Sequence, residues 1–551
     1  MFAVARFLMK RISAVLLSLL LLACGVIEPQ KPHADLPFSE LRGSGSDPAR
    51  ECEKAKALLD RIERGELNGA KAQAALDARK EALELLCSDA ALAYVRYCFD
   101  VTDAEKLRAY DALCERIDAL RDTLAAAERQ LKKDPSDRLR CGTGDAIGTL
   151  RRRERALIAR YAALPATLFV PYGGRQWTGD AILSDLSLSE ADFAALYEAY
   201  TQLFHAEASA IFRELIRVRN AIAEQCGFDA CPDRAYCGGD VSREDAETFS
   251  ARVKAAFSPL LQKLTPDFFA AAGRLYGMAF QKEETIGRVG EAICALLPEL
   301  QKPWEYMIGH GLYDFGTGET RMPGSFTTYF AAYRAPFLFG EWTGGFDMPP
   351  LIAHEFGHYA SLFRNGDVNK FRNRSDLAEF DAQGLELLIV LRYDTLYGNL
   401  RNAAETAALF YAVYTLLSGC MEEAFERFAY GGSDVSAQAL DAEYARLLDE
   451  YGLSAFGIDP RSWTQSARLF QTPFSGVGYA LGTAAALELY LLSRRDAPRA
   501  IDAYRAVLFR ETDAAFGETL KRAGLSDPLE PGTLERTAYE LGSARRNSTN
   551  E

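Results

Sequence analysis

The sequence predicts a mainly α-helical protein that contains one small β-sheet. Two segments predict helices, about 51–165 and about 188–300, because both are rich in good helix formers and carry apolar residues at helical spacing. A third observation predicts the sheet. Between about 310 and 347, Gly, aromatic and Thr residues replace Ala and Leu, and residues 335–343 form an apolar run typical of a strand. Helices are expected to resume after residue 345.

The first residues are typical of a bacterial export signal. Arg6, Lys10 and Arg11 precede an apolar run at 12–22, and the run ends in Leu-Leu-Ala-Cys-Gly, which resembles a lipobox. We therefore expect cleavage before Cys24 and lipidation of that cysteine, which would anchor the protein to a membrane outside the cytoplasm. An uncleaved anchor is the alternative.

The remaining chain divides by composition. A stretch rich in Pro, Gly and Ser without helical periodicity predicts a tether, and the polar last residues predict a frayed end. The expected segments are a signal peptide at 1–23, a flexible tether at 24–50, an N-terminal helical region at 51–187, the region that carries the chemistry at 188–535, and a polar C-terminal tail at 536–551.

The charge balance argues against a nucleic-acid partner. The chain has 63 Lys and Arg against 77 Asp and Glu, a formal net charge of −14, and no local basic stripe. Export places the cysteines where disulfides can form, and the close group Cys226, Cys231 and Cys237 favours a local bridge. A zinc knuckle at these three cysteines is the weaker alternative.

The most informative motif is His-Glu-x-x-His at 354–358, which uses two of only five histidines. On a helix, His354 and His358 differ by about 40° around the axis, so both can offer a ring nitrogen to one metal ion. Glu355 lies beside the first ligand, where its carboxylate can reach a water molecule. Asp347, followed by two prolines, is the expected N-cap of this helix. The alternative is a pair of hydrogen-bonded histidines on a buried helix face.

A third metal ligand after His358 must be a carboxylate, because no histidine follows. The segment 376–390 predicts a largely buried helix, where charges are unfavourable unless paired or bound to metal. Glu379 and Glu386 are seven residues apart and share a face. One of them can ligate while the other accepts a hydrogen bond from a ligating imidazole. Acids on an exposed helix face are the alternative.

With these residues the sequence resembles the thimet oligopeptidase and oligoendopeptidase F group of zinc peptidases. The likeness covers about 190–500 and is carried by the segments 354–358, 376–386, 219–228, 421–430 and 472–482. It implies a helical ellipsoid of two lobes around a deep cleft. It also implies one zinc ion per chain, held by His354, His358 and Glu379, with Glu355 as the general base and Glu386 and Asp347 in supporting roles.

The resemblance also implies where a substrate would bind. The strand at 335–343, with Phe339 and Gly340, would edge the cleft and pair with the peptide backbone. The related loop facing the zinc usually carries a His and several Tyr, but here only Tyr479 keeps a phenol. Tyr479 is the expected oxyanion donor, and a packed structural tyrosine is the alternative. Gly476 and Gly478 would let the loop approach a peptide, although close helix packing explains them almost as well.

The function expected from the sequence is a monomeric, membrane-anchored zinc metalloendopeptidase that cleaves short peptides outside the cytoplasm. The alternative is a catalytically weak or inactive peptide-binding lipoprotein that retains the peptidase fold. His205 and His310 are expected to be ordinary structural histidines, and Cys420 a buried side chain.

Overall fold

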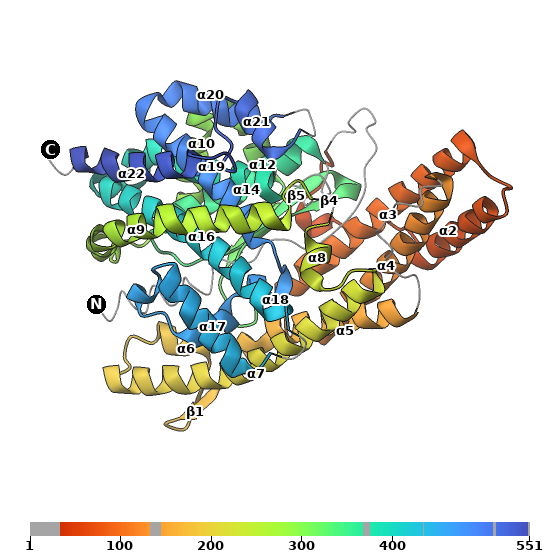
Figure 1. The fold of residues 1–551 in the computed structure, drawn as a ribbon, viewed down its shortest axis with the longest axis horizontal. Coiled ribbons are helices and arrows are strands. Elements are labelled where there is room, and N and C mark those ends of the chain that lie inside the picture. The colour runs from red at the N-terminus through yellow and green to blue at the C-terminus, as the bar shows by residue number, and fades with distance from the viewer. Residues whose placement is uncertain are drawn as a thin grey trace.

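The structure is a computed structural model that describes residues 33–132, 145–237, 239–366, 375–432, 435–510 and 514–548. The expected mainly helical architecture with small sheets is confirmed (Figure 1). The N-terminal half contains the helices α2 (Pro48–Glu63), α3 (Gly69–Cys98), α4 (Ala104–Lys132), α5 (Asp145–Thr167), α6 (Gly179–Ser184), α7 (Glu190–Gln225), α8 (Cys231–Ala235), α9 (Arg243–Leu275), α10 (Lys282–Leu296) and α11 (Gln301–Gly309).

The C-terminal half contains the helices that form the centre of the protein. They are α12 (Met348–Asn365), α14 (Ser375–Leu388), α15 (Tyr393–Tyr397), α16 (Arg401–Tyr430), α17 (Ala437–Glu450), α18 (Ala467–Gln471), α19 (Gly476–Arg495), α20 (Ala497–Leu508), α21 (Phe516–Arg522) and α22 (Thr533–Ser548).

The N-terminal helices form an extended arm. Helices α2, α3 and α4 pack on one another at one end of the molecule, and α5 runs along α7 (Figure 1). Ser189 caps α7 by accepting a hydrogen bond from the backbone N–H of Asp192. An antiparallel hairpin of β1 (Val170–Tyr172) and β2 (Arg175–Trp177) lies between α5 and α6.

The sheet expected between residues 310 and 347 is present, but its strand order corrects one prediction. It consists of β3 (Tyr313–Gly316), β4 (Phe326–Phe330) and β5 (Ala335–Glu341) in the order β3-β5-β4. β5 is parallel to β3 and antiparallel to β4, so it is the middle strand. The expectation that this strand pairs with a peptide backbone is therefore wrong at residues 338 and 339, where β5 pairs with both β3 and β4.

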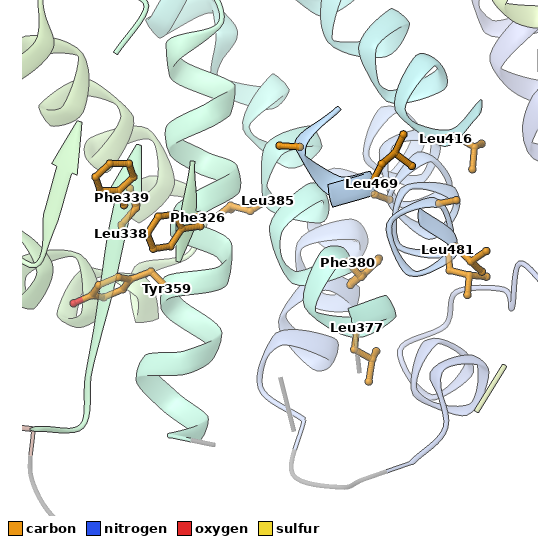
Figure 2. Packing of buried hydrophobic residues seen from close by; sticks show 14 of the residues in the cluster. Phe326, Leu338, Phe339, Tyr359, Leu377, Phe380, Leu385, Leu416, Leu469 and Leu481 are labelled. Atoms are coloured by element: carbon orange, nitrogen blue, oxygen red, sulfur yellow. The ribbon is translucent and has the colours of Figure 1, made fainter. Parts of the chain in front are cut away.

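Helices α12, α14, α16 and α19 pack tightly because small residues lie where they meet. A Cβ on Gly357 of α12 would lie 2.4 Å from the carbonyl oxygen of Asp381 in α14. A Cβ on Gly482 of α19 would lie 2.6 Å from the Cβ of Glu379 on the other side of α14. Figure 2 shows apolar side chains of α14 filling the remaining space beside α19, among them Leu377 and Phe380. These helices therefore form one block with fixed spacing.

One polar contact also joins this block to its neighbours. The fully buried carboxylate of Asp381 accepts hydrogen bonds from Ser361 of α12 at 2.7 Å and from Arg510 after α20 at 2.8 Å.

Among the described residues, α19 is the helix long and apolar enough to cross a membrane, yet 83% of its apolar window is buried inside the protein. Its hydropathy reflects its place in the core.

The N-terminal segment corrects the expected tether. From residue 33 onward the chain lies on the body: His33 stacks on Phe363 of α12 with ring centroids 3.8 Å apart, and Leu41 is buried. Phe38 packs on Phe337 of β5 at 4.4 Å. Apolar side chains placed between the prolines explain the docking, so the prediction of a flexible tether extending to residue 50 is wrong for residues 33–47.

The C-terminal tail prediction is also wrong for the described residues after 536. They belong to α22, in which Leu534, Ala538 and Leu541 are buried at helical spacing against neighbouring helices. The charged residues between them lie on the other face and obscure this stripe in the sequence.

The expected local disulfide is not formed. Cys226 is disulfide-bonded, whereas Cys231 and Cys237 are free, so its partner lies outside the described residues. Helix α8 places Cys231 in the hydrophobic core, away from pairing with its neighbours in sequence. Cys420 is fully buried and free, as expected.

Candidate metal centre

Helix α12 carries the His-Glu-x-x-His motif into the core. Asp347 occupies its N-cap position, followed by prolines at the first turn, as predicted. Its side chain makes no capping hydrogen bond and instead accepts one from Thr343 Oγ1 at 3.0 Å. That contact fixes the turn between β5 and α12. It also means that the expected capping role of Asp347 is wrong.

The three predicted ligands come together between α12 and α14. His354 Nε2 lies 3.9 Å from Glu379 Oε2, and His358 Nε2 lies 3.8 Å from Glu379 Oε1. One donor atom from each residue lies within 4.8 Å of the others. Two ligands that share one zinc ion at about 2.0–2.2 Å each are up to about 4 Å apart. The three side chains therefore have the spacing of a metal site.

The chemistry of Glu379 supports this fit. Its side chain is fully buried, and its Oε1 makes no hydrogen bond in the described part of the chain. Burial raises the pKa of Glu379 to about 7. A buried carboxylate oxygen without a donor is unfavourable unless a cation lies against it. A divalent ion between the two imidazoles would satisfy this oxygen.

Glu386 lies where its spacing predicts, beside His354. Its Oε2 lies 2.9 Å from His354 Nδ1, so the imidazole donates its Nδ1 proton to this carboxylate, which leaves Nε2 as the nitrogen that faces Glu379. Burial lowers the pKa of His354, but the hydrogen bond and the charge of Glu386 outweigh this effect and raise it to about 9.

Glu355 is held next to this centre. It is 2% exposed, and Oγ1 of Thr327 in β4 donates to its Oε2 at 3.0 Å. Burial raises the pKa of Glu355 to about 7, which suits a group that accepts and releases a proton near neutral pH. The sheet thus positions Glu355, and α12 positions His354 and His358.

Tyr479, the expected oxyanion donor, borders the same centre. Its hydroxyl donates a hydrogen bond to Glu379, and Gln383 Nε2 lies 3.3 Å from Glu379 Oε2. In this arrangement Tyr479 orients a ligand carboxylate. Its role toward a substrate remains a prediction.

An enclosed cavity of about 190 Å³ opens beside the centre. Its wall includes His354, Glu355 and Tyr479, together with Ser325 and Glu341 where β4 begins and β5 ends. The rest of the wall is rich in aromatic residues from α15, α16, α17 and the segment after α17; it includes Tyr393, Tyr397, Phe410, Tyr411, Tyr414, Tyr444 and Phe456. Such a wall suits peptide side chains.

The four residues expected to contact substrate are used for packing. Phe339 is fully buried and stacks on Phe326 at 5.0 Å, and a Cβ on Gly340 would lie 2.5 Å from Phe315. A Cβ on Gly476 would lie 2.4 Å from the carbonyl oxygen of Gly419, and one on Gly478 would lie 2.2 Å from Ser375 Oγ. None of the four is among the residues that line the cavity, and their contact with a substrate stays a prediction.

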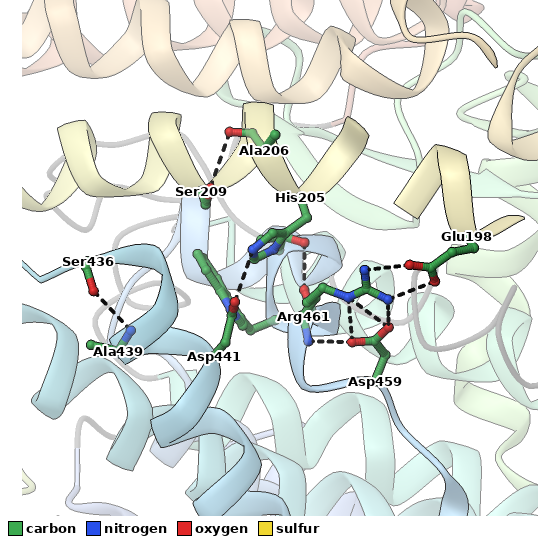
Figure 3. A network of polar contacts seen from close by, with 11 residues as sticks. Glu198, His205, Ala206, Ser209, Ser436, Ala439, Asp441, Asp459 and Arg461 are labelled. Carbon is green, nitrogen blue, oxygen red and sulfur yellow. Dashed lines mark hydrogen bonds and ion pairs between the residues drawn. The ribbon is translucent and has the colours of Figure 1, made fainter. Parts of the chain in front are cut away.

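The remaining described histidines are structural, as expected. His310 contacts Asp35 at 2.8 Å in the docked N-terminal segment. His205 of α7 contacts Asp441 of α17 at 3.2 Å (Figure 3). In the same network Arg461 binds both Glu198 of α7 and Asp459. These contacts fix the segment that leads into α18.

No protein-family profile and no curated protein matches the sequence, but solved structures match its fold over most of its length. The similar structures include PZ peptidase A with inhibitor 2, with a TM-score of 0.79 and 18% identity over 93% of this chain and 99% of that chain. A putative oligoendopeptidase F from Bacillus anthracis str. Ames has a TM-score of 0.76 and 16% identity over 93% and 99%. Another putative oligoendopeptidase F has a TM-score of 0.74 and 19% identity over 93% and 98%.

This chain has the oligoendopeptidase fold. The expectation from the resemblance is thereby confirmed for the fold, including the helical region before residue 188, where the sequence signal was weak.

Sequence reasoning missed part of the cavity. The aromatic wall looks like ordinary core in the sequence, and the buried pair of Glu422 and Arg468 is formed by residues 46 positions apart. Three acids close together in a largely apolar helix, Glu422, Glu423 and Glu426, were the available signal for a buried polar site on α16.

Proposed function

We propose that the protein is a zinc-dependent metallo-oligopeptidase that hydrolyses internal bonds of short peptides. The observation that carries the proposal is the convergence of His354, His358 and Glu379 on one point, with Glu355 beside them at the wall of an enclosed cavity. The oligoendopeptidase fold supports it. A cavity of this size admits a flexible peptide segment and excludes a folded protein.

Each residue has a role that follows from its contacts. A zinc ion in this site supplies a Lewis acid that polarises a carbonyl group and makes water more acidic. Glu355 takes a proton from water and delivers it to the departing amine. Thr327 holds the Glu355 carboxylate in place by a hydrogen bond of 3.0 Å. Glu386 fixes the His354 ring so that Nε2 is the ligand atom.

A non-catalytic peptide-binding protein is the second candidate. The loop between Leu469 and Gly478 has no histidine and no tyrosine, so Tyr479 supplies the single phenol there. Loss of a donor to a developing oxyanion typically lowers the rate by about 10²–10³. This observation favours slow turnover, whereas the intact ligand set favours retained catalysis.

The test compares Glu355→Gln with the wild type in the full chain, purified in detergent. We expect the wild type to hold one zinc ion and to cleave quenched fluorescent peptides of roughly five to fifteen residues. Glu355→Gln should keep the zinc and lose most of its turnover. Glu291→Gln, the same change at an exposed position of α10, is the matched control. Equal rates for the wild type and Glu355→Gln would support the binding protein instead.

The location of the protein is part of the proposal. We propose that Cys24 carries a lipid and that the monomer works outside the cytoplasm, on the basis of the export signal and lipobox-like sequence. Residues 1–32 lie outside the described part of the chain. Mass spectrometry of the N-terminal peptide from membrane fractions tests the lipid directly, and Cys24→Ser should release the protein from the membrane.

A further inference from the structure

The cavity wall carries a cation that the proposed mechanism does not use. Arg468 of α18 is the only lysine or arginine among the described residues that line the cavity. Acidic side chains line the same space, including Glu341, Asp347 and Glu422. Among the charged side chains of this aromatic-rich wall, the single guanidinium gives the cavity a distinct anion-binding point.

Arg468 is held rigidly. Its Nε and Nη2 both donate to Oε2 of Glu422, the first at 2.7 Å, and Oε1 of Glu422 accepts from Ser466 at 2.9 Å. The guanidinium carbon lies 5.2 Å from the ring centroid of Tyr479. The preceding segment is fixed by Arg461 and its partners (Figure 3). The guanidinium therefore has a defined position before any ligand arrives.

One end of this guanidinium is not used by the protein. Arg468 is 4% exposed, and among the described residues no hydrogen bond or ion pair reaches its Nη1. Nη1 carries two of the five N–H donors of the side chain. Because Arg468 lines the cavity, a ligand that offers an anionic oxygen would accept a charge-assisted hydrogen bond from Nη1.

Its position relates it to the reacting bond. Tyr479 packs under the guanidinium, and the hydroxyl of the same ring donates to Glu379. Arg468 is thus one aromatic ring away from a metal ligand. An extended peptide advances about 3.3–3.6 Å per residue, so this separation corresponds to about one or two residues.

We propose that Arg468 binds a carboxylate of the substrate through Nη1, one or two residues from the cleaved bond. This inference rests on the proposed function. The carboxylate can come from the C-terminus of the peptide or from an acidic side chain. In the first case the enzyme removes short C-terminal fragments, and in the second it prefers acidic residues beside the cleavage site.

The test measures peptide affinity without turnover, in the full-length Glu355→Gln protein, by fluorescence anisotropy. One pair of peptides differs only in a C-terminal carboxylate or carboxamide, and a second set replaces internal Gln by Glu at each position. We expect the acidic member of one set to bind at least about 10-fold more tightly. A preference in the first set identifies the C-terminus as the source, and a preference in the second identifies a side chain.

Two variants in the same background assign the preference to Arg468. Arg468→Gln with Glu422→Gln removes both buried charges, which avoids a lone buried carboxylate, and should abolish the preference. Glu422→Gln alone removes the competing anion and should enlarge it. The same double change in α17, Glu443→Gln with Arg446→Gln, at a pair of which Arg446 is exposed and Glu443 is half-buried, is the matched control and should leave the preference unchanged.

The inference is overturned if acidic and neutral peptides bind equally, if no acidic peptide binds, or if the preference survives loss of Arg468. These outcomes are separate from the proposed function. Absence of cleavage by the wild type would refute catalysis, whereas the binding preference is measured in a protein that does not need to turn over.

Discussion

Replacing Gly482 with alanine should weaken zinc binding and destabilise the protein together. The new Cβ would lie 2.6 Å from the Cβ of Glu379 and 2.9 Å from its carbonyl carbon. Carbon atoms rest about 3.5–4.0 Å apart, so α14 or α19 must move by about 1 Å. A zinc site tolerates changes of only about 0.2 Å in its ligand distances. The shift therefore displaces one ligand by several times the tolerance.

The expected cost has two parts. Forcing an extra methyl group into a packed core destabilises a protein by about 1–3 kcal/mol. Displacement of Glu379 should lower zinc affinity by at least about 10-fold. Urea unfolding of the metal-free protein measures the first part, and competition with a chromophoric chelator measures the second.

Gly287→Ala in α10 is the matched control for Gly482→Ala. No atom lies within 4 Å of a Cβ built at Gly287. This substitution should leave zinc affinity unchanged and stabilise the helix by about 0.5–1 kcal/mol, because alanine loses less backbone entropy than glycine. The reasoning would be refuted if Gly482→Ala kept zinc affinity within about twofold of wild type and unfolded at the same urea concentration.

Three further predictions follow from contacts at the site and at the C-terminus. Glu386→Ala should lower zinc affinity by about 10–100-fold, measured with the same chelator, and unchanged affinity would contradict its role in orienting His354. Apparent zinc affinity should fall by about tenfold per pH unit below the His354 pKa of about 9, because protons compete with the metal. The fall should be steeper below the Glu379 pKa of about 7. A flat profile from pH 8 to 6 would argue against His354 and Glu379 as ligands. Leu541→Ala should reduce the free energy of unfolding by about 2–5 kcal/mol, and an effect below about 0.5 kcal/mol would mean that α22 is not packed.

The sequence predicted which side chains converge between α12 and α14 because that information is local. A four-residue spacing on one helix and a seven-residue spacing on the next decide which side chains share a face, and both helices formed as expected. The scarcity of histidine made the pattern specific. The pairing of His354 with Glu386 needed one further inference, namely that two buried helices present these faces to each other.

The errors all depend on contacts between distant segments. The order β3-β5-β4 arises from a parallel crossover, so it could not be inferred from the apolar run of β5. In the sequence, Gly476 and Gly478 suggested a loop that can approach a peptide. The structure places them in α19, where they allow close contact with α16 and α14. Arg468 and Glu422 carry no local pattern, and only the fold brings them to the same wall.

The docked N-terminal segment limits where the protein can work if Cys24 is lipidated as proposed. Only residues 25–32 separate that cysteine from His33, which already stacks on α12. Eight extended residues reach at most about 28 Å, less than the width of a domain of this size. The enzyme would then sit close above the lipid headgroups with little freedom to swivel, and it would sample peptides that diffuse along the bilayer surface.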